Sequence, residues 1–142
     1  MDLPAFSDVD YDGDIDILTF EISGGFVHYF KNQSIENYGN CDYLEYDHAH
    51  GCWGDFYEGL NTYTLDCMNC MCPPINVGTS NKGQKHAGSS LLAMDVDGDN
   101  DKDLILGDVS YNNLNLLING GDNQLSLIHI SEPTRRTPIA YA

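Results

Sequence analysis

The sequence DVDYDGDID, residues 8–16, has an aspartate at every second position, and DVDGDNDKD, residues 95–103, repeats this arrangement. A calcium ion in a protein takes about six to eight oxygen ligands, which alternating Asp side chains on a tightly curled loop can supply. Gly13, at the sixth position, permits a sharp backbone turn. Asn100 replaces it in the second loop and enters the left-handed region more readily than most residues. The spacing therefore predicts two calcium-binding loops.

The positions in each loop have separate expected roles. The side chains of the first, third, fifth and ninth residues are expected to bind the ion, together with the backbone carbonyl oxygen of the seventh. The predicted side-chain ligands are Asp8, Asp10, Asp12, Asp16, Asp95, Asp97, Asp99 and Asp103, and the predicted carbonyl ligands are Asp14 and Asp101. Without metal the carboxylates repel one another, so we expect each empty loop to be disordered and two Ca²⁺ ions to contribute folding free energy.

An EF-hand begins with a similar pattern, but it needs a bidentate Glu at the twelfth position and a helix after it. Thr19 and Leu106 occupy that position in the two loops, and residues typical of strands follow them. A merely solvated acidic turn would explain one loop but not two loops with identical spacing. The pattern therefore favours a calcium loop between strands over both alternatives.

The two loops belong to a longer internal repeat. An offset of 87 residues places Asp8 on Asp95 and Asn32 on Asn119 without a gap. In each copy, a short apolar segment precedes the loop and two β-forming segments, separated by turn residues, follow it. We expect entry segments at 3–6 and 90–94, and hairpins formed by 15–22 with 26–31 and by 104–109 with 114–118. Helical periodicity is absent, so the sequence predicts an all-β fold.

Residues 33–84 interrupt the repeat and read as a long insertion that holds all five cysteines and the only tryptophan. We expect it to contain the remaining short strand or strands of the first copy, and residues 62–66 are the best candidate. Trp53, Tyr57 and Tyr63 could form a surface on which a carbohydrate stacks, although packing in the core or in a loop is favoured. His28, in a predicted strand, is interpreted as a packed side chain.

The cysteines of the insertion allow three interpretations. If the protein is exported, disulfides are favoured, because a long loop without a large core of its own is commonly cross-linked. The expected pairs are Cys41 with Cys52 and two of Cys67, Cys70 and Cys72. A zinc site is the second interpretation, with Cys67, Cys70 and Cys72 joined by His86 or by His48 and His50. Free thiols are the third.

The sequence contains 22 Asp and Glu against 6 Lys and Arg, a formal net charge of -16 at pH 7. Such a charge repels phosphate backbones and anionic membrane surfaces, so nucleic acid is not an expected partner. No apolar run is long enough to span a membrane, so membrane insertion is not expected. The first six residues lack the features of a signal peptide and leave little room for a strand ahead of the first loop, which favours an internal start.

Residues 125–142 differ in character from the rest of the chain. Residues 125–135 resemble the in-frame translation of a sequencing-library adapter, and residues 139–142 resemble the adapter's far end. We therefore expect a non-native tail, outside the fold, after a natural segment that ends at about Gln124. A genuine tail with a short strand at 125–130 is the alternative.

Motifs of catalysis are absent from the sequence. It contains no Gly-x-Ser-x-Gly, no phosphate-binding glycine loop and no HExxH. Paired Asp side chains could serve a glycosidase, but carboxylates that hold calcium are ionised and make poor general acids. The sequence therefore favours a protein that is not an enzyme.

Both loops, with the hydrophobic pair that follows them and Gly107-Asp108, resemble the FG-GAP or VCBS-type repeat of integrin-like β-propellers, as found in secreted surface proteins of Bacteroidetes-type bacteria. The resemblance covers about residues 3–32 and 90–121 and carries the core D-x-D-x-D-G-x-x-D. It implies a partial propeller over residues 1–124, with about two blades, a calcium ion in a hairpin loop of each and a cysteine-containing insertion. Asn100, the insertion and the presence of only two copies depart from the family pattern.

The resemblance also implies a function. The chain is expected to be a calcium-binding module of a secreted or cell-surface protein, with a structural, adhesive or ligand-binding role. The expected partners are a protein or glycan ligand and the remaining blades of the parent protein. An accessory propeller domain of an exported enzyme, and a zinc-dependent interaction module built on the insertion, are the alternatives.

Overall fold

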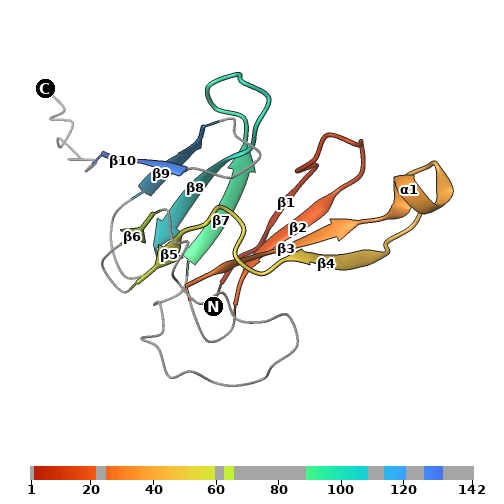
Figure 1. The fold of residues 1–142 in the computed structure, drawn as a ribbon, viewed down its shortest axis with the longest axis horizontal. Helices are drawn as coiled ribbons and strands as arrows, with labels where there is room; N and C mark the ends of the chain where they lie inside the picture. The colour runs from red at the N-terminus through yellow and green to blue at the C-terminus, as the bar shows by residue number, and fades with distance from the viewer. Residues whose placement is uncertain are drawn as a thin grey trace, which may run out of the picture.

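The computed structural model describes residues 2–21, 25–59, 63–65, 89–108, 114–120 and 127–132, with residue 108 and the last range described by their backbone alone. Strands predominate in these residues, as the sequence predicted, and the only helix among them is short (Figure 1). The elements are β1 (Ala5–Ser7), β2 (Asp16–Phe20), β3 (Val27–Asn32), α1 (Ser34–Tyr38), β4 (Tyr46–His50), β5 (Tyr57–Glu58), β6 (Tyr63–Thr64), β7 (Ser89–Met94), β8 (Asp103–Asp108), β9 (Leu114–Asn119) and β10 (Leu127–Glu132).

The strands form two four-stranded antiparallel sheets and a separate two-stranded one. The first sheet has the order β1-β2-β3-β4 and the second β10-β9-β8-β7, so consecutive strands are neighbours in both; β5 pairs with β6. The central hairpins share one register, since Ile17 lies opposite Phe30 and Leu104 opposite Leu117. Each expected hairpin therefore has its counterpart in the structure, at the same offset of the sequence.

Alternating burial explains why these segments form strands. In β2 the residues are alternately buried and half-buried, and β9 repeats the alternation. Successive side chains of a strand point to opposite faces, so such a segment can bury one face as a strand but not as a helix.

One hydrophobic core joins the two large sheets. It includes Leu18 and Val27 from the first sheet and Leu104 and Leu117 from the second. Trp53, which is 4% exposed, and Phe56 of the insertion belong to the same core. A carbohydrate-stacking surface that includes Trp53 is therefore excluded, because the indole ring is buried between the sheets.

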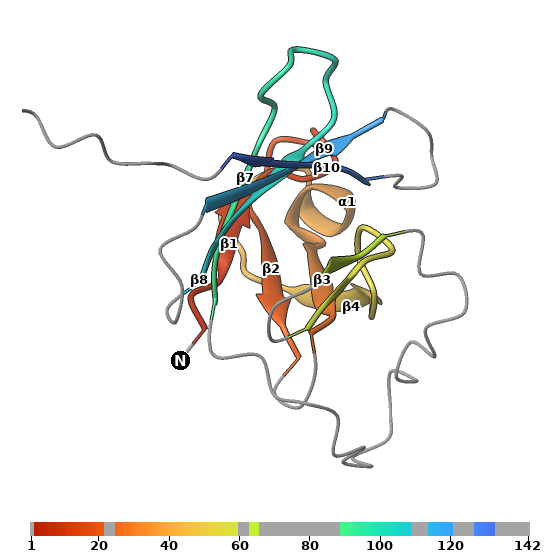
Figure 2. The ribbon, with the colours of Figure 1, turned by 90° about the vertical axis from the view of Figure 1, so that its left-hand side faces the viewer.

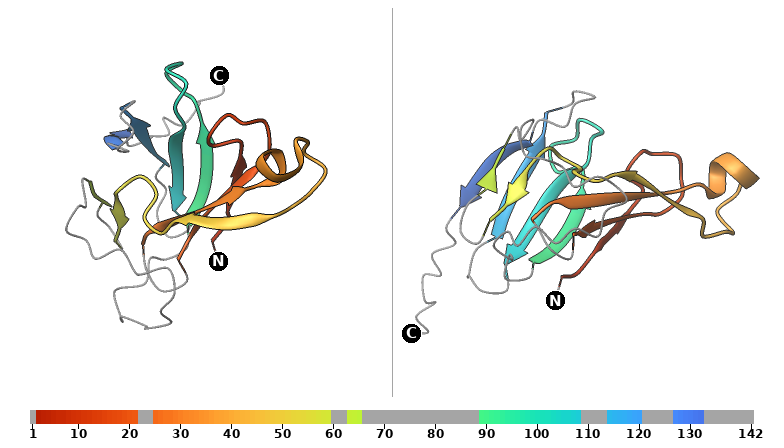
Figure 3. Two further views of the ribbon diagram at one scale, coloured as in Figure 1. Left: turned by 45° about the vertical axis from the view of Figure 1, so that its right-hand side comes forward. Right: turned by 60° about the horizontal axis from the view of Figure 1, so that its bottom comes forward.

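The first strands of the two sheets lie side by side near the middle of the molecule. The backbone N–H of Leu3 donates to the carbonyl of Ser89, and the N–H of Leu91 donates to the carbonyl of Leu3, each at 3.0 Å. Leu3 thus forms a parallel β-bridge with Ser90 of β7. From this seam the sheets extend outward, with β4 and β10 at outer edges that face away from each other (Figures 1 and 3).

The β5–β6 hairpin of the insertion is attached to both sheets by buried polar groups. The hydroxyl of Ser89 donates to both carboxylate oxygens of Glu58, at 3.0 and 2.9 Å, and the Tyr63 hydroxyl donates to one of them at 3.2 Å. Asn115 of β9 donates to the Tyr63 hydroxyl at 2.7 Å, and the Glu58 N–H donates to the carbonyl of Gly25 at 2.9 Å. Such bonds satisfy a carboxylate that is 2% exposed.

Several sequence predictions about strands were wrong. The fourth strand of the first sheet is β4, and not residues 62–66, of which Tyr63–Thr64 pair with β5 instead. Strand β4 is an outer edge with mostly exposed residues, so it has no apolar alternation to reveal it. The segment before the first loop does have room for a strand, the three-residue β1. The helix α1 was not expected.

Residues 125–142 were expected to lie outside the fold, but β10 lies within them and pairs with β9 along its length. The edge of β9 presents unpaired backbone groups that a β-forming segment of any origin can satisfy. The pairing therefore corrects the expected extent of the fold and carries no information on the origin of the tail.

The predicted pairing of Cys41 with Cys52 was also wrong. Cys41 is a free, exposed thiol, whereas Cys52 is disulfide-bonded and 1% exposed. Cys41 lies beside the first acidic loop, where its Sγ donates to the carbonyl of Gly13 at 3.4 Å. The remaining cysteines, and His86 of the zinc alternative, lie outside the described residues.

Candidate metal centre

The two acidic loops occupy the same place in the two large sheets. Each connects the first strand to the second, and both lie at one end of the molecule, the upper end in Figures 1 and 2. They also contact each other, since the amino group of Lys102 lies 3.8 Å from the centre of the Tyr11 ring. The cation–π contact holds the second loop against the first.

Backbone N–H groups turn inward in both loops and donate to aspartate side chains. In each loop the first Asp accepts from the sixth residue and the fifth Asp accepts from the seventh. The bonds are Gly13 N to Asp8 Oδ2 at 3.2 Å, Asp14 N to Asp12 Oδ1 at 3.0 Å, Asn100 N to Asp95 Oδ2 at 3.1 Å and Asp101 N to Asp99 Oδ1 at 2.9 Å. The two loops are thus curled in the same way.

Left-handed backbone conformations recur at the same two positions. The fourth residues, Tyr11 and Gly98, have φ of 61° and 84°, and the sixth residues, Gly13 and Asn100, have φ of 104° and 71°. The turn at the sixth position was predicted, and Asn100 takes the left-handed conformation there. The turn at the fourth position was not predicted, because only the second loop has a glycine there.

The ninth aspartate of each loop is buried and fastens the loop to the third strand. Asp16 and Asp103 are both 0% exposed, and each accepts two backbone N–H bonds. Asp16 accepts from Val9 and Asn32, both at 2.8 Å, and Asp103 accepts from Val96 at 2.7 Å and Asn119 at 2.8 Å. Burial raises the pKa of Asp16, and the two N–H donors oppose that shift. These two side chains are therefore structural anchors as well as predicted ligands.

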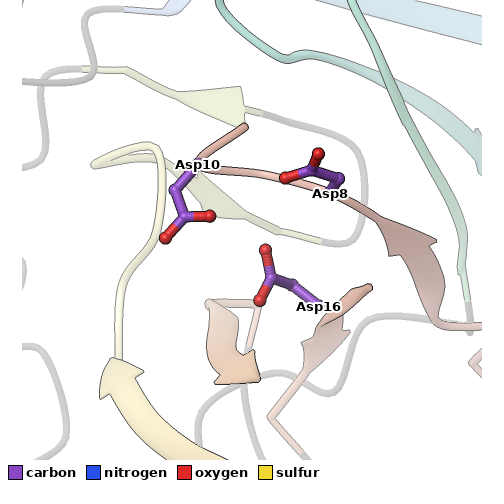
Figure 4. Close-up of side chains that lie close together, drawn as sticks. All are labelled: Asp8, Asp10 and Asp16. Atoms are coloured by element: carbon purple, nitrogen blue, oxygen red, sulfur yellow. The ribbon is translucent and has the colours of Figure 1, made fainter. Parts of the chain in front are cut away.

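Carboxylates converge in both loops. In the first, oxygens of Asp8, Asp10 and Asp16 lie within 4.8 Å of one another and point to a common region (Figure 4). In the second, Asp95, Asp97 and Asp99 converge within the same distance. An ion held at about 2.4 Å from each oxygen can bridge such a spacing. The structure does not bring Asp103 into the second group.

The side chain of Asp14, whose backbone carbonyl is the predicted ligand, has surroundings that the sequence did not reveal. Its side chain is buried, and Oδ2 accepts from the N–H of Ile35 at 3.1 Å. Burial raises the pKa of Asp14, and the carboxylates of Asp12 and Glu36 raise it further against the opposing bond from Ile35. Oδ1 of Asp14 and Oδ1 of Asp8 are buried with no hydrogen-bond partner among the described residues. Buried carboxylate oxygens without a donor fit a bound cation.

Two residues of the first loop's surroundings were missed from the sequence. The amino group of Lys31 forms ion pairs with Asp10 and Glu36 and lies 3.5 Å from Asp12. The carboxylates of Asp10 and Glu36 raise the pKa of Lys31. A second group of converging oxygens, from Asp10, Asp12 and Glu36, surrounds this region. Glu36 belongs to α1, whose five residues are too few to reveal a helix by periodicity.

Protein-family models, curated proteins and solved structures were compared with the chain, and none of them matches it. Within the described residues, no helix has the length and apolar character needed to cross a bilayer. The converging atoms of both loops are hard carboxylate oxygens, a donor set that suits calcium or magnesium better than softer transition metals.

Proposed function

We propose that the chain is a calcium-binding module of the β-propeller kind, about two blades long, from a secreted or cell-surface protein. Two Ca²⁺ ions bind, one in each acidic loop, and their role is structural. The module serves adhesion or the binding of a protein or glycan ligand, together with further blades of the parent protein, and performs no catalysis.

One observation carries the proposal: the same polar framework is built twice. Both loops have the same inward hydrogen bonds, the same two left-handed positions and the same buried aspartate anchor. A solvated acidic turn does not require these three features. A bound ion does require a curled backbone, because oxygens must surround it. The repetition supports metal binding as the shared purpose.

The arrangement of the sheets supports the propeller part of the proposal. In a propeller, each blade is a four-stranded antiparallel sheet with consecutive strands adjacent, and neighbouring blades pack around a central axis. Here two such sheets lie with β1 beside β7 and share one core. The disulfide at Cys52 supports a location outside the cytosol, because disulfides persist in oxidising compartments.

Calorimetric titration with calcium tests the metal binding. The chain should bind two equivalents, one per loop, whereas a variant with Asp10→Ala and Asp97→Ala should bind almost none. The matched control is Asp47→Ala, an exposed aspartate of β4 outside both loops, which should leave both equivalents in place. No heat of binding from the unaltered chain would reject the proposal.

A further inference from the structure

Lys31 places a positive charge inside the first acidic loop. Its amino group pairs with Asp10 and Glu36 and lies 3.5 Å from Oδ2 of Asp12. Oxygens of these same three residues converge in a group that could hold a metal ion, and Asp10 also belongs to the neighbouring group with Asp8 and Asp16. The amino group therefore stands where a metal ion would meet the same carboxylates, and it neutralises part of their charge.

The second loop has no equivalent group. Ile118 occupies in β9 the place of Lys31 in β3, because the next residues, Asn32 and Asn119, make the same bond to the aspartate anchor of their loop. Among the described residues, Asp95, Asp97 and Asp99 form no ion pair. Lys102, the cation of the second loop, lies over the Tyr11 ring instead. The two loops thus share their curled backbone, but only the first has an ammonium group paired with its aspartates.

The first loop retains an oxygen that Lys31 does not satisfy. Asp14 is 1% exposed, and its Oδ1 has no hydrogen-bond partner in the described part of the chain. The carboxylates of Asp12, Glu36 and Asp10 lie near enough to raise the pKa of Asp14, so its unsatisfied oxygen is part of the acidic cluster. A divalent ion can bind there and gain a ligand that the amino group leaves unused.

We propose that Lys31 is an internal competitor of calcium in the first loop, so that the two loops have different calcium affinities. This inference rests on the calcium binding proposed above. An ion that enters the first loop displaces the amino group from Asp10 and Asp12, whereas an ion that enters the second loop meets no such competitor.

Two glycine amides report on the loops separately. The N–H of Gly13 donates to Asp8, and the N–H of Gly98 donates to Oδ1 of Asp95 at 2.6 Å. The chain labelled with ¹⁵N is titrated with calcium chloride, and the midpoints of the two amide shifts are compared. The midpoint at Gly98 should lie about tenfold below that at Gly13, since displacing a partly exposed ion-pair network opposes binding by about that factor.

Two variants decide between the outcomes. Lys31→Met should lower the midpoint at Gly13 about tenfold and leave Gly98 unchanged, while Ile118→Lys should raise the midpoint at Gly98. If both amides respond but neither substitution moves its own midpoint, the inference is overturned and the calcium function stands. If no amide responds in the unaltered chain, both are overturned. Should Lys31→Met fail to fold, Ile118→Lys alone decides.

Discussion

The carboxylate of Asp16 accepts the backbone N–H of Asn32 at 2.8 Å and so ties the end of the first acidic loop to the end of β3. Asp103 and Asn119 repeat this bond, at the same distance, in the second sheet. Both aspartates are completely buried, so these bonds are made out of contact with water. Each anchor therefore holds its loop to its sheet whether or not an ion is bound.

Replacement of either buried aspartate, Asp16 or Asp103, should destabilise the fold even when no metal is bound. Asp16→Asn and Asp103→Asn each set an amide NH₂ against one of two backbone donors, which leaves a buried N–H unsatisfied and lowers the free energy of unfolding by about 1–3 kcal/mol. Urea unfolding in the presence of a chelator measures this loss. Tyr29→Phe is the matched control, since it removes only the 3.3 Å bond to Asp16 and should have a smaller effect.

Gly25→Ala, two residues before β3, should be strongly destabilising. A Cβ at this position would overlap the backbone carbonyl of Glu58, which cannot move without the whole β5–β6 hairpin. We expect a loss of about 2–3 kcal/mol in the free energy of unfolding. At Gly107 an added Cβ would lie 2.7 Å from the Ser90 hydroxyl, a mobile group. Gly107→Ala should therefore destabilise the protein less than Gly25→Ala. Thermal melting that shows equal losses for these two variants would contradict this account.

Much of the fold, but only part of the site, could be predicted from the sequence. The hairpins were predicted because two β-forming segments separated by turn residues follow each loop, and such composition is local to the chain. The strand β4 could not be found in this way, since an exposed outer edge selects no apolar face. Lys31 and Glu36 were missed because α1 brings a later residue back over the loop, and no local spacing encodes that return.

The cysteine pairing shows the same limit. Cys41 and Cys52 were predicted to pair, but β4 lies between them and one residue is exposed while the other is buried. Disulfide geometry depends on which side chains the fold brings together, and sequence separation does not determine that.

Stability should fall in mildly acidic solution because of His28. Its ring stacks on that of His48 with centroids 4.7 Å apart, and burial, followed by the charge of His48, lowers the pKa of His28 below 6.5 against the opposing effect of Glu21. The unfolded chain therefore takes up this proton at a higher pH than the folded chain does. Above about pH 7, His28 should not reduce the free energy of unfolding. As the pH drops through 6.5, protonation of this residue in the unfolded chain should lower that free energy.

Urea unfolding at about pH 7.5 and about pH 5.5 measures this dependence. The control is His28→Gln, which cannot take up the proton and should lose less stability between the two pH values. A loss of the same size in both proteins would assign the effect to other groups.

The two cysteines of the described chain should behave in opposite ways. Cys41→Ser should leave the melting temperature almost unchanged, because the thiol is exposed and unpaired. Cys52→Ser should lower stability by about 2–5 kcal/mol, since it removes a disulfide and a buried side chain. A thiol reagent should label Cys41 in the folded protein. Protection of Cys41 until the chain unfolds would contradict its assignment as a free thiol.

Calcium-dependent stability tests the central claim most directly, namely that paired acidic loops bind ions and thereby hold their sheets together. Urea unfolding of the 142-residue chain is compared in excess calcium and in chelator. Calcium at about 100 times the dissociation constant should raise the free energy of unfolding by about 2.7 kcal/mol for each occupied loop, and the Asp10→Ala, Asp97→Ala variant should lose that gain. Identical unfolding curves with and without calcium would contradict the account.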